Sequence, residues 1–240
     1  MPSGIDHIVI AVNDLDTTSR DFAAAGFTVV PGGEHHSGKS ANLLVAFQDG
    51  TYFELIAFGD VNDPESGPWA VALRGSGEGL VDFALRTEDL DAEVEALTAA
   101  GLTVIGPVAG GRMRPDGQRI DWRTVRFEED GLPFYCHDET ARPLRVPDGD
   151  QAKHANGVTG VASLSLAVVD VGLASRLYRR LTGLDGNDVA GGKRFAVGNR
   201  AVDLVAGAGR RPLEVVLTGG SGGTVLDEGL THGARLMVAE

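Results

Sequence analysis

The sequence is short of the residues that build disulfides, basic surfaces and membrane spans. It has a single cysteine, Cys136, so no internal disulfide can form and a reducing, cytoplasmic setting is expected. Lysine and arginine number 21 against 34 aspartates and glutamates, and the net charge of −13 argues against binding to nucleic acid or to anionic membranes. No apolar run approaches the ~18 residues of a membrane span, and no signal peptide is predicted at the start.

Glycine, in contrast, is abundant, with 34 residues in a chain of 240. Many of these glycines fall at turn positions, which is typical of short strands with tight connections. The length allows one large or two small domains with a sizeable core. These features indicate a globular protein that is rich in short strands.

One pattern recurs three times, namely a short apolar strand that runs directly into the acidic start of a helix. The copies lie at residues 5–16, 80–91 and 161–170. Aligned on the aspartate that starts each helix, they carry different side chains at one strand position: His7, Asp82 and Ser163. Repetition of this kind indicates supersecondary units that share a core, and this strand position is where chemistry is expected.

The first two copies each begin a unit with the order β-α-β-β-β. In the first unit, residues 5–58, the glycine-rich segment 31–38 is predicted as a loop, and Asp49-Gly50 as a hairpin turn. The second unit, residues 80–139, repeats that turn at Asp130-Gly131. The connector between the units is predicted to hold a short helix near residues 69–73.

The remainder of the chain predicts a linker and a third, abbreviated unit. Residues 141–156 contain two prolines and mixed charge, as expected of a linker. In residues 157–240 we expect one strand, a helix with a leucine stripe, a hairpin, a further strand and a final helix over 225–235. The predicted organisation is therefore a two-unit domain at residues 1–140, the linker, and a third partial module at 157–240.

The motifs of the first two units resemble the vicinal oxygen chelate superfamily, and within it the glyoxalase-like branch. The resemblance covers residues 5–139 and extends more weakly to the third unit. The motifs that carry it are Asp6–Val12 with Asp14-Leu15, Gly26–Val29, Ser40–Asn42, Asp49–Ile56, Arg114–Gly117 and Trp122-Arg123. The resemblance implies an α+β fold in which paired βαβββ modules form a half-open barrel.

The resemblance also implies a metal site at the mouth of the barrel. In metal-dependent members, the first and last strands of each module provide four ligands to a divalent ion. Carried onto this sequence, the set is His7, Glu54, Asp82 and His137, and the ion would be Zn, Ni, Mn, Fe or Co. Other interpretations stay open, because a strand histidine is commonly a hydrogen-bonded core residue, a buried Glu54 needs a partner, and Asp82 suits a salt bridge.

Further pocket residues are expected beside the metal. Asn42 and Tyr135 are candidates, as are Trp122 and Arg123 in a hairpin that is rich in arginine. In this hairpin a strand is predicted near residues 120–127. Alternation along it places Arg119, Asp121 and Arg123 on one face and Ile120, Trp122 and Thr124 on the other. An arginine that points into the barrel would bind a carboxylate or phosphate through two hydrogen bonds. Alternatively, the arginines lie on a solvent-exposed face of the strand and pair with nearby acids. His35 and His36 are expected on the surface. The alternative is that they form part of a lid over the mouth of the barrel.

The leading functional hypothesis is a metal-assisted lyase or isomerase for a small molecule with vicinal oxygens. Glu54 would serve both as a metal ligand and as the proton-transfer base. The alternative is a metal-free protein that binds a metabolite or antibiotic. A third hypothesis is a structural homodimer without a retained site. The third unit offers Ser163 and Asp203, a poor metal pair, so its expected role is structural or dimer-forming.

Overall fold

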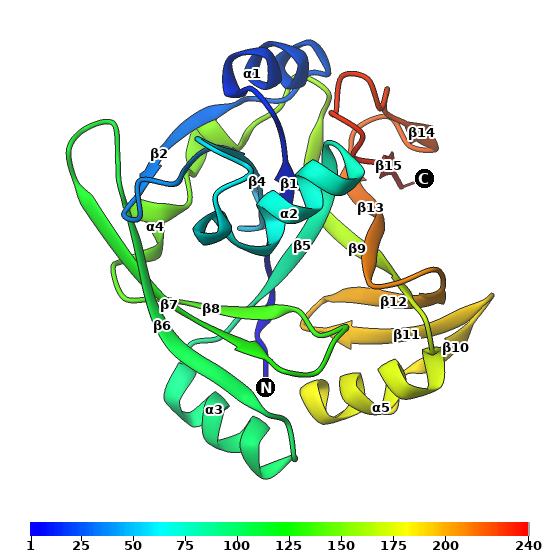
Figure 1. The fold of residues 1–240 in the computed structure, drawn as a ribbon. Helices are drawn as coiled ribbons and strands as arrows, with labels where there is room; N and C mark the ends of the chain where they lie inside the picture. Colours follow the sequence, from blue (N-terminus) through cyan, green and yellow to red (C-terminus); the bar gives the residue numbers. More distant parts are fainter. Residues whose placement is uncertain (240) are drawn as a thin grey trace.

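The computed structural model describes residues 1–239, and its first two modules have the predicted β-α-β-β-β order (Figure 1). The first module consists of β1 (Gly4–Ala11), α1 (Leu15–Ala24), β2 (Val30–His35), β3 (Ser40–Ala46) and β4 (Tyr52–Phe58). The second consists of β5 (Gly79–Arg86), α3 (Leu90–Ala99), β6 (Val104–Met113), β7 (Arg119–Phe127) and β8 (Phe134–Asp138).

The repeated aspartate of the sequence starts a helix in each module. The side chain of Asp14 accepts a hydrogen bond from the backbone N–H of Thr17, and Asp89 accepts one from Ala92. These bonds satisfy N–H groups at the helix starts that have no partner inside the helix. The chain therefore leaves β1 and β5 in the same way, which places equivalent strand positions at equivalent points of the fold.

The two modules form one barrel with the strand order β1-β4-β3-β2-β6-β7-β8-β5. It closes between β2 and β6 through only two residue pairs, Glu34–Met113 and His35–Arg112. The loop predicted at residues 31–38 is therefore largely strand β2. Its glycines are needed because β6 comes very near: Gly33 has φ +124°, and a Cβ there would overlap the carbonyl oxygen of Met113.

A second, seven-stranded sheet follows the barrel in the chain. Its first part is a βαβββ module: β9 (Val158–Val168), α5 (Val171–Thr182), β10 (Asn187–Val189), β11 (Gly192–Val197) and β12 (Arg200–Ala206). The first strand, the helix and the hairpin match the prediction, whereas the short strand β10 is an addition to it. The remaining strands are β13 (Arg211–Gly219), β14 (Thr224–Val225) and β15 (Leu236–Val238).

These last three strands are the remnant of a fourth module. Strand β13 pairs antiparallel with β9 and parallel with β15, just as β5 pairs with β1 and with β8. The final helix predicted over 225–235 is wrong, because this segment is a series of turns between β14 and β15. His232 and Gly233, both with positive φ, fall in these turns, and such backbone does not continue a helix.

The two connecting segments both carry helices. The connector holds a 3-10 turn (Pro64–Ser66) and α2 (Gly67–Ser76), so the predicted short helix is confirmed and is longer than expected. The linker at 141–156 holds the single turn α4 (Arg142–Arg145) and a 3-10 turn at Gly149–Ala152. Within residues 1–239, no helix is long and apolar enough to cross a membrane.

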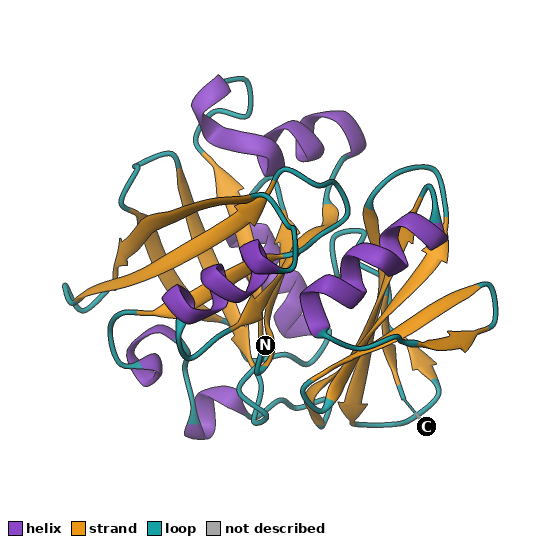
Figure 2. Cartoon of the chain, turned by 90° about the horizontal axis from the view of Figure 1, so that it is seen from below, coloured by secondary structure: helices purple, strands orange, loops and turns teal. Residues whose placement is uncertain are grey.

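The barrel and the second sheet lie side by side and share a core (Figure 2). Ile8 and Ile10 project from the outer face of β1, and Leu164 and Leu166 project from β9 into the same fully buried cluster. Burial of such side chains contributes roughly 1.5–3 kcal/mol each. Because β1 and β5 are packed against the second sheet on their outer faces, their inner faces are held firmly around the barrel interior.

Candidate functional site

A cavity of about 180 Å³ lies inside the barrel and is lined by both modules. The first module contributes the polar wall, made by His7, His35, Asn42 and Glu54. The opposite wall carries aromatic rings, a thiol and a guanidinium group: Trp69 from α2, with Trp122, Arg126, Phe134 and Cys136 from β7 and β8. The cavity therefore has one side suited to proton chemistry and one side suited to an apolar group.

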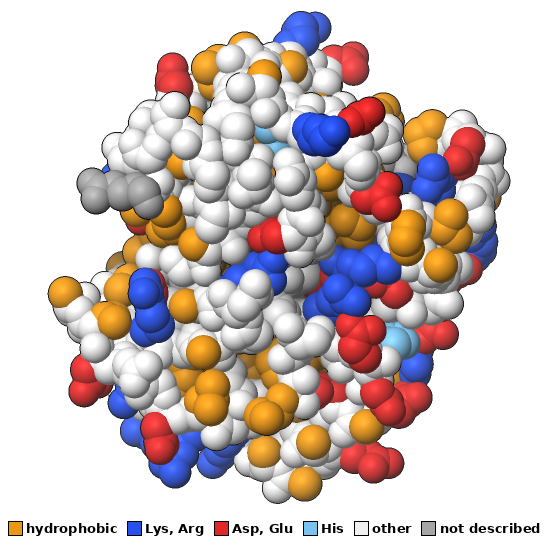
Figure 3. Space-filling view, turned by 180° about the vertical axis from the view of Figure 1, so that it is seen from behind, with side chains coloured by type: hydrophobic (Ala, Val, Ile, Leu, Met, Phe, Trp, Pro, Cys, Tyr) orange, Lys and Arg blue, Asp and Glu red, His pale blue; other side chains and the backbone are white. Residues whose placement is uncertain are grey.

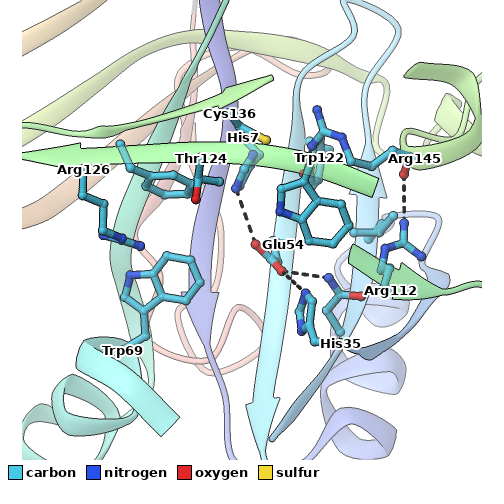
Figure 4. Close-up of a pocket in the computed structure, with 14 residues that line it drawn as sticks. His7, His35, Glu54, Trp69, Arg112, Trp122, Thr124, Arg126, Cys136 and Arg145 are labelled. Atoms are coloured by element: carbon cyan, nitrogen blue, oxygen red, sulfur yellow. Dashed lines mark hydrogen bonds and ion pairs between the residues drawn. The ribbon is translucent and has the colours of Figure 1, made fainter. Parts of the chain in front are cut away.

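Glu54 lies at the centre of the polar wall (Figure 4). The amide of Asn42 donates a hydrogen bond of 2.8 Å to Oε1, and the Nε2 atoms of His35 and His7 lie 3.4 and 3.5 Å from the two carboxylate oxygens. Burial raises the pKa of Glu54, but these three partners outweigh it, His35 most of all, and lower the pKa from 4.5 to about 2. The carboxylate is therefore ionised at any physiological pH, despite being 6% exposed.

His7 is oriented from behind by Asp6. Its Nδ1 lies 2.7 Å from Oδ2 of Asp6, and its ring stacks on Tyr52 with 4.7 Å between centroids. Burial raises the pKa of Asp6, but the charges of Arg145 and Arg142 and the hydrogen bond with His7 together outweigh it and keep that pKa well below its ordinary value. An ionised Asp6 accepts a hydrogen bond from a proton on Nδ1, which leaves Nε2 as the nitrogen that faces Glu54.

The linker supplies the charges that hold Asp6 in place. The guanidinium group of Arg145 donates 2.9 Å to Asp6 and also bonds Asp138 at 3.0 Å, and Arg142 bonds the same two carboxylates. Sequence reasoning missed both arginines because 141–156 was interpreted only as a spacer. The signal that points to them is Asp6 itself, since an acid in a buried strand requires a cationic partner.

Asp82, a predicted metal ligand, is instead the centre of a salt-bridge network. Its Oδ2 accepts from Nε1 of Trp69 at 2.9 Å and from Arg126 at 3.1 Å, and its Oδ1 accepts from Arg210 at 2.6 Å. Burial raises the pKa of Asp82, and the charges of Arg210 and Arg126 outweigh that effect and lower it. With its oxygens committed to these donors, Asp82 is bound as a counter-ion.

Tyr135 and His137 lie on the face of β8 that points away from the cavity. The hydroxyl of Tyr135 is 3.5 Å from Glu93 of α3, and Nδ1 of His137 is 3.1 Å from the carbonyl oxygen of Thr87. Side chains alternate along a strand, so the inward positions of β8 are Phe134 and Cys136. The structure therefore does not bring His137 together with His7 and Glu54.

Strand pairing identifies the counterparts of His7 and Glu54 in the second module. Across β1 and β5, His7 pairs with Ala84 and Val9 pairs with Asp82, so the pairing is symmetric and exchanges His7 with Asp82 and Val9 with Ala84. Glu54 pairs with Val9, and Phe134 pairs with Ala84, so Phe134 is the counterpart of Glu54. Asp82 and Phe134 thus occupy the places from which the second pair of metal ligands was expected.

The donors present do not complete the predicted metal centre. Phe134 has no donor atom, and the oxygens of Asp82 are committed to Trp69, Arg126 and Arg210. Within residues 1–239, no group of three or more His, Cys, Asp or Glu side chains is arranged to hold a metal ion. Only His7 and Glu54 of the predicted set meet, and the chemistry of the cavity rests on them.

Of the remaining predicted pocket residues, some line the cavity and others lie outside it. Asn42 and Trp122 line the cavity, whereas Arg123 lies on the outer face of β7 and pairs with Asp91 and Glu139. The inward arginine of this strand is Arg126. His35, which was expected on the surface, lines the cavity because the extension of β2 carries it beside Glu54.

A family model described as a glyoxalase-like domain matches residues 5–182 of the sequence. This range covers the whole barrel, the linker and the first strand and helix of the second sheet. None of the curated proteins with which the sequence was compared matches it.

Solved structures reproduce the whole arrangement at low sequence identity. A hypothetical protein from Staphylococcus aureus is 15% identical, with a TM-score of 0.80 over 98% of both chains. A mutant of 4-hydroxymandelate synthase from Streptomyces coelicolor is 14% identical, with a TM-score of 0.59 over 91% of this chain and 72% of that one. A xylose isomerase-like TIM barrel/4-hydroxyphenylpyruvate dioxygenase fusion protein is 16% identical, with a TM-score of 0.59 over 91% of this chain and 37% of that one. At these identities the likeness concerns the fold.

Proposed function

This chain belongs to the glyoxalase-like domain family, within the vicinal oxygen chelate superfamily, and we propose that it is a lyase or isomerase that moves a proton on a small molecule with adjacent oxygen atoms. The observation that carries the proposal is the buried row Asp6–His7–Glu54, which ends at the cavity. A carboxylate that orients one ring nitrogen leaves the other free for proton transfer.

In this proposal His7 carries the proton. Neutral His7 takes a proton from the substrate carbon next to a carbonyl, and the electron pair of that C–H bond moves onto the carbonyl oxygen. Glu54 has a pKa of about 2, too low for an efficient base near neutral pH, but its charge stabilises the imidazolium that forms. The role of base that the sequence suggested for Glu54 therefore passes to His7. An isomerase returns the proton to the neighbouring carbon, and a lyase expels a leaving group instead.

The negative charge on the substrate oxygen develops in a cavity that contains the guanidinium groups of Arg112 and Arg126. Fixed cationic groups in a site shielded from water stabilise such an anion without reorganising during the reaction. The metal-assisted form of the reaction, which the resemblance implied, requires two further donors, but Phe134 has none and the oxygens of Asp82 are committed to Arg126 and Arg210.

A second candidate function is ligand binding without turnover. The wall made by Trp69, Trp122 and Phe134 favours it, because aromatic surface supports affinity whether or not a proton moves. The two functions differ in what Glu54 does. In the enzyme, loss of its charge removes turnover, whereas in a binding protein much of the ligand affinity remains.

Proton exchange in deuterated water tests the proposal directly. Wild-type protein is incubated with a panel of 2-hydroxy and 2-oxo compounds, and deuterium at the carbon beside the carbonyl is followed by NMR. We expect exchange with at least one compound in the wild type and none in His7→Gln. Binding without exchange would replace the enzyme by the binding protein. Elemental analysis runs in parallel, and one equivalent of a divalent metal that is lost in His7→Ala would restore the metal-assisted reaction.

A further inference from the structure

We infer that the substrate is a carboxylate whose anionic group binds Arg126, and that Arg210 of the second sheet positions Arg126 through Asp82. The inference rests on the proposed function of the same cavity and names its substrate class. It begins from the inward face of β7, where Trp122, Thr124 and Arg126 follow one another at alternate positions.

Arg126 lies over the aromatic wall. Its guanidinium carbon lies 5.2 Å from the ring centre of Trp69 (Figure 4) and 4.6 Å from that of Phe134. Its Nη1 donates to Asp82 at 3.1 Å. Within residues 1–239, its Nε and Nη2 donate to no protein acceptor, and the side chain is 41% exposed. A planar guanidinium group with free N–H groups matches a carboxylate bidentately.

The charge around the cavity runs against that of the whole chain. The chain carries a net charge of −13, and Figure 3 shows basic and acidic side chains mixed over one face. The cavity and the ion pairs behind it, however, hold five arginines against four carboxylates. The arginines are Arg112, Arg126, Arg142, Arg145 and Arg210, and the carboxylates are Asp6, Glu54, Asp82 and Asp138. Such local positive charge attracts an anion.

Two features leave positive charge uncompensated in this group. Arg126 and Arg210 share one carboxylate, Asp82. The two terminal nitrogens of Arg112 donate to the backbone carbonyl oxygens of Gly32 and Arg145, so Arg112 is bonded to neutral acceptors. A carboxylate on a carbon that also bears a carbonyl or hydroxyl oxygen would supply the missing negative charge. It would also bring the adjacent oxygens that the proposed reaction needs, and the aromatic wall would contact an apolar substituent.

Arg210 does not line the cavity, and it acts through Asp82. It lies in the loop between β12 and β13, and its Nη2 donates to Oδ1 of Asp82 at 2.6 Å. The other oxygen, Oδ2, holds both Trp69 and Arg126. Arg210 is thus a positioning residue that ties the second sheet to two side chains of the cavity wall.

The chain provides its own optical probe for the test. It has two tryptophans, Trp69 and Trp122, and both line the cavity. Tryptophan fluorescence and calorimetry are used to titrate the protein with phenylglyoxylate, a 2-oxo acid with a phenyl ring, and with its neutral methyl ester. We expect the wild type to bind the acid at least about tenfold more tightly than the ester, because only the acid forms charge-assisted hydrogen bonds with Arg126.

The matched variants are Arg126→Gln and Arg123→Gln, which make the same substitution at opposite faces of one strand. Arg126→Gln should lower the affinity for the acid by about tenfold or more and leave that for the ester unchanged. Arg123→Gln should change neither, because its partners Asp91 and Glu139 lie outside the barrel. Both positions are partly exposed, so both variants are expected to fold.

The positioning role is tested at Arg210. Arg210→Gln should lower only the affinity for the acid, by about threefold, and shift the emission of Trp69, whereas Arg210→Lys should restore much of both because it keeps the charge. A general loss of structure would weaken acid and ester together, which contradicts positioning.

Three results would overturn the inference: a wild type that binds the ester as tightly as the acid, a wild type that binds neither, or an unchanged acid preference in Arg126→Gln. Failure of the proposed function has a different signature. A preference for the acid that depends on Arg126, without any proton exchange, would retain the anion site and retire the catalytic role of His7.

Discussion

The three modules share connectivity and strand register but differ at the two matched inward positions. The first module carries His7 and Glu54 there, the second carries Asp82 and Phe134, and the third carries Ser163 and Asp203. In the third module, Asp203 is bound bidentately by Arg194 at 2.6 Å for both contacts. Only the first module keeps an ionised carboxylate that faces a titratable ring.

The comparison shows that the fold of these modules does not depend on their polar inward residues. What recurs in all three is the capping aspartate and the alternation of the first strand, and these are maintained whether the inward position is charged, apolar or neutralised. Chemistry is therefore free to concentrate in one module. The second module then serves as the opposite wall, and the second sheet buttresses β1 and β5 from outside.

The largest expected effect comes from removing the carboxylate of the first module. Glu54→Gln keeps the shape of the side chain and the bond from Asn42 but removes the charge beside His7. We expect proton exchange to fall by about 100- to 1,000-fold, the usual range for losing one group that stabilises charge in the transition state. NMR exchange rates measure it.

The matched control is Asp203→Asn, the same change at the equivalent position of the third module. It should leave exchange at the wild-type rate, because Asp203 is neutralised by Arg194 and lies in the second sheet. An equal loss of proton exchange in the two variants would mean that the activity does not depend on the first module in particular.

The carboxylate of Glu54 should also make the free energy of unfolding depend on pH in the acidic range. The folded-state pKa of Glu54, about 2, lies below its ordinary 4.5, so its contribution is fully present above pH 4.5 and is lost as the pH falls toward 2. The difference corresponds to about 3 kcal/mol. Urea unfolding at pH 5, 4, 3 and 2 should show a loss in the wild type that exceeds that in Glu54→Gln by about this amount. Parallel curves for the two proteins would show that Glu54 is not held ionised.

The sequence predicted the modules well because local signals carry them. Capping aspartates, Asp-Gly turns and apolar alternation act over a few residues, so they are visible without tertiary structure. His7 and Glu54 were found for the same reason, since both lie in regular strands at matched positions. The glycine-rich segment 31–38 failed as a signal because its glycines serve the close approach of β6 rather than a loop.

The second half of the site could not be predicted, for a different reason. Alignment of the two turns Asp49-Gly50 and Asp130-Gly131 pairs Glu54 with Tyr135, which is one residue away from its counterpart Phe134. A one-residue error along a strand moves a side chain to the other face, so Tyr135 and His137 fell outside the barrel. Arg145 and Arg210 reach the site from the linker and the second sheet, and such contacts between distant segments leave no local pattern.

A smaller effect is expected where the second sheet meets the barrel. Arg210→Gln leaves the buried Asp82 with Arg126 as its remaining cationic partner. Removing one member of a buried ion pair is costly, and because a second guanidinium stays in place we expect a loss of about 2 kcal/mol. Equilibrium urea unfolding measures it. Destabilisation close to zero would mean that the two parts are held together by the apolar core alone.

The smallest effect is expected from the corresponding break on the open face of the second sheet. Arg194→Gln removes the bidentate partner of Asp203, but the Arg194 side chain is 48% exposed, so water replaces the lost contacts. We expect a loss below about 1 kcal/mol in the same urea experiment, with proton exchange unchanged. A loss as large as that of Arg210→Gln would show that the third module depends on its neutralised pair as strongly as the barrel depends on Asp82. In that case the contrast between a reactive first module and an inert third would hold for catalysis but not for stability.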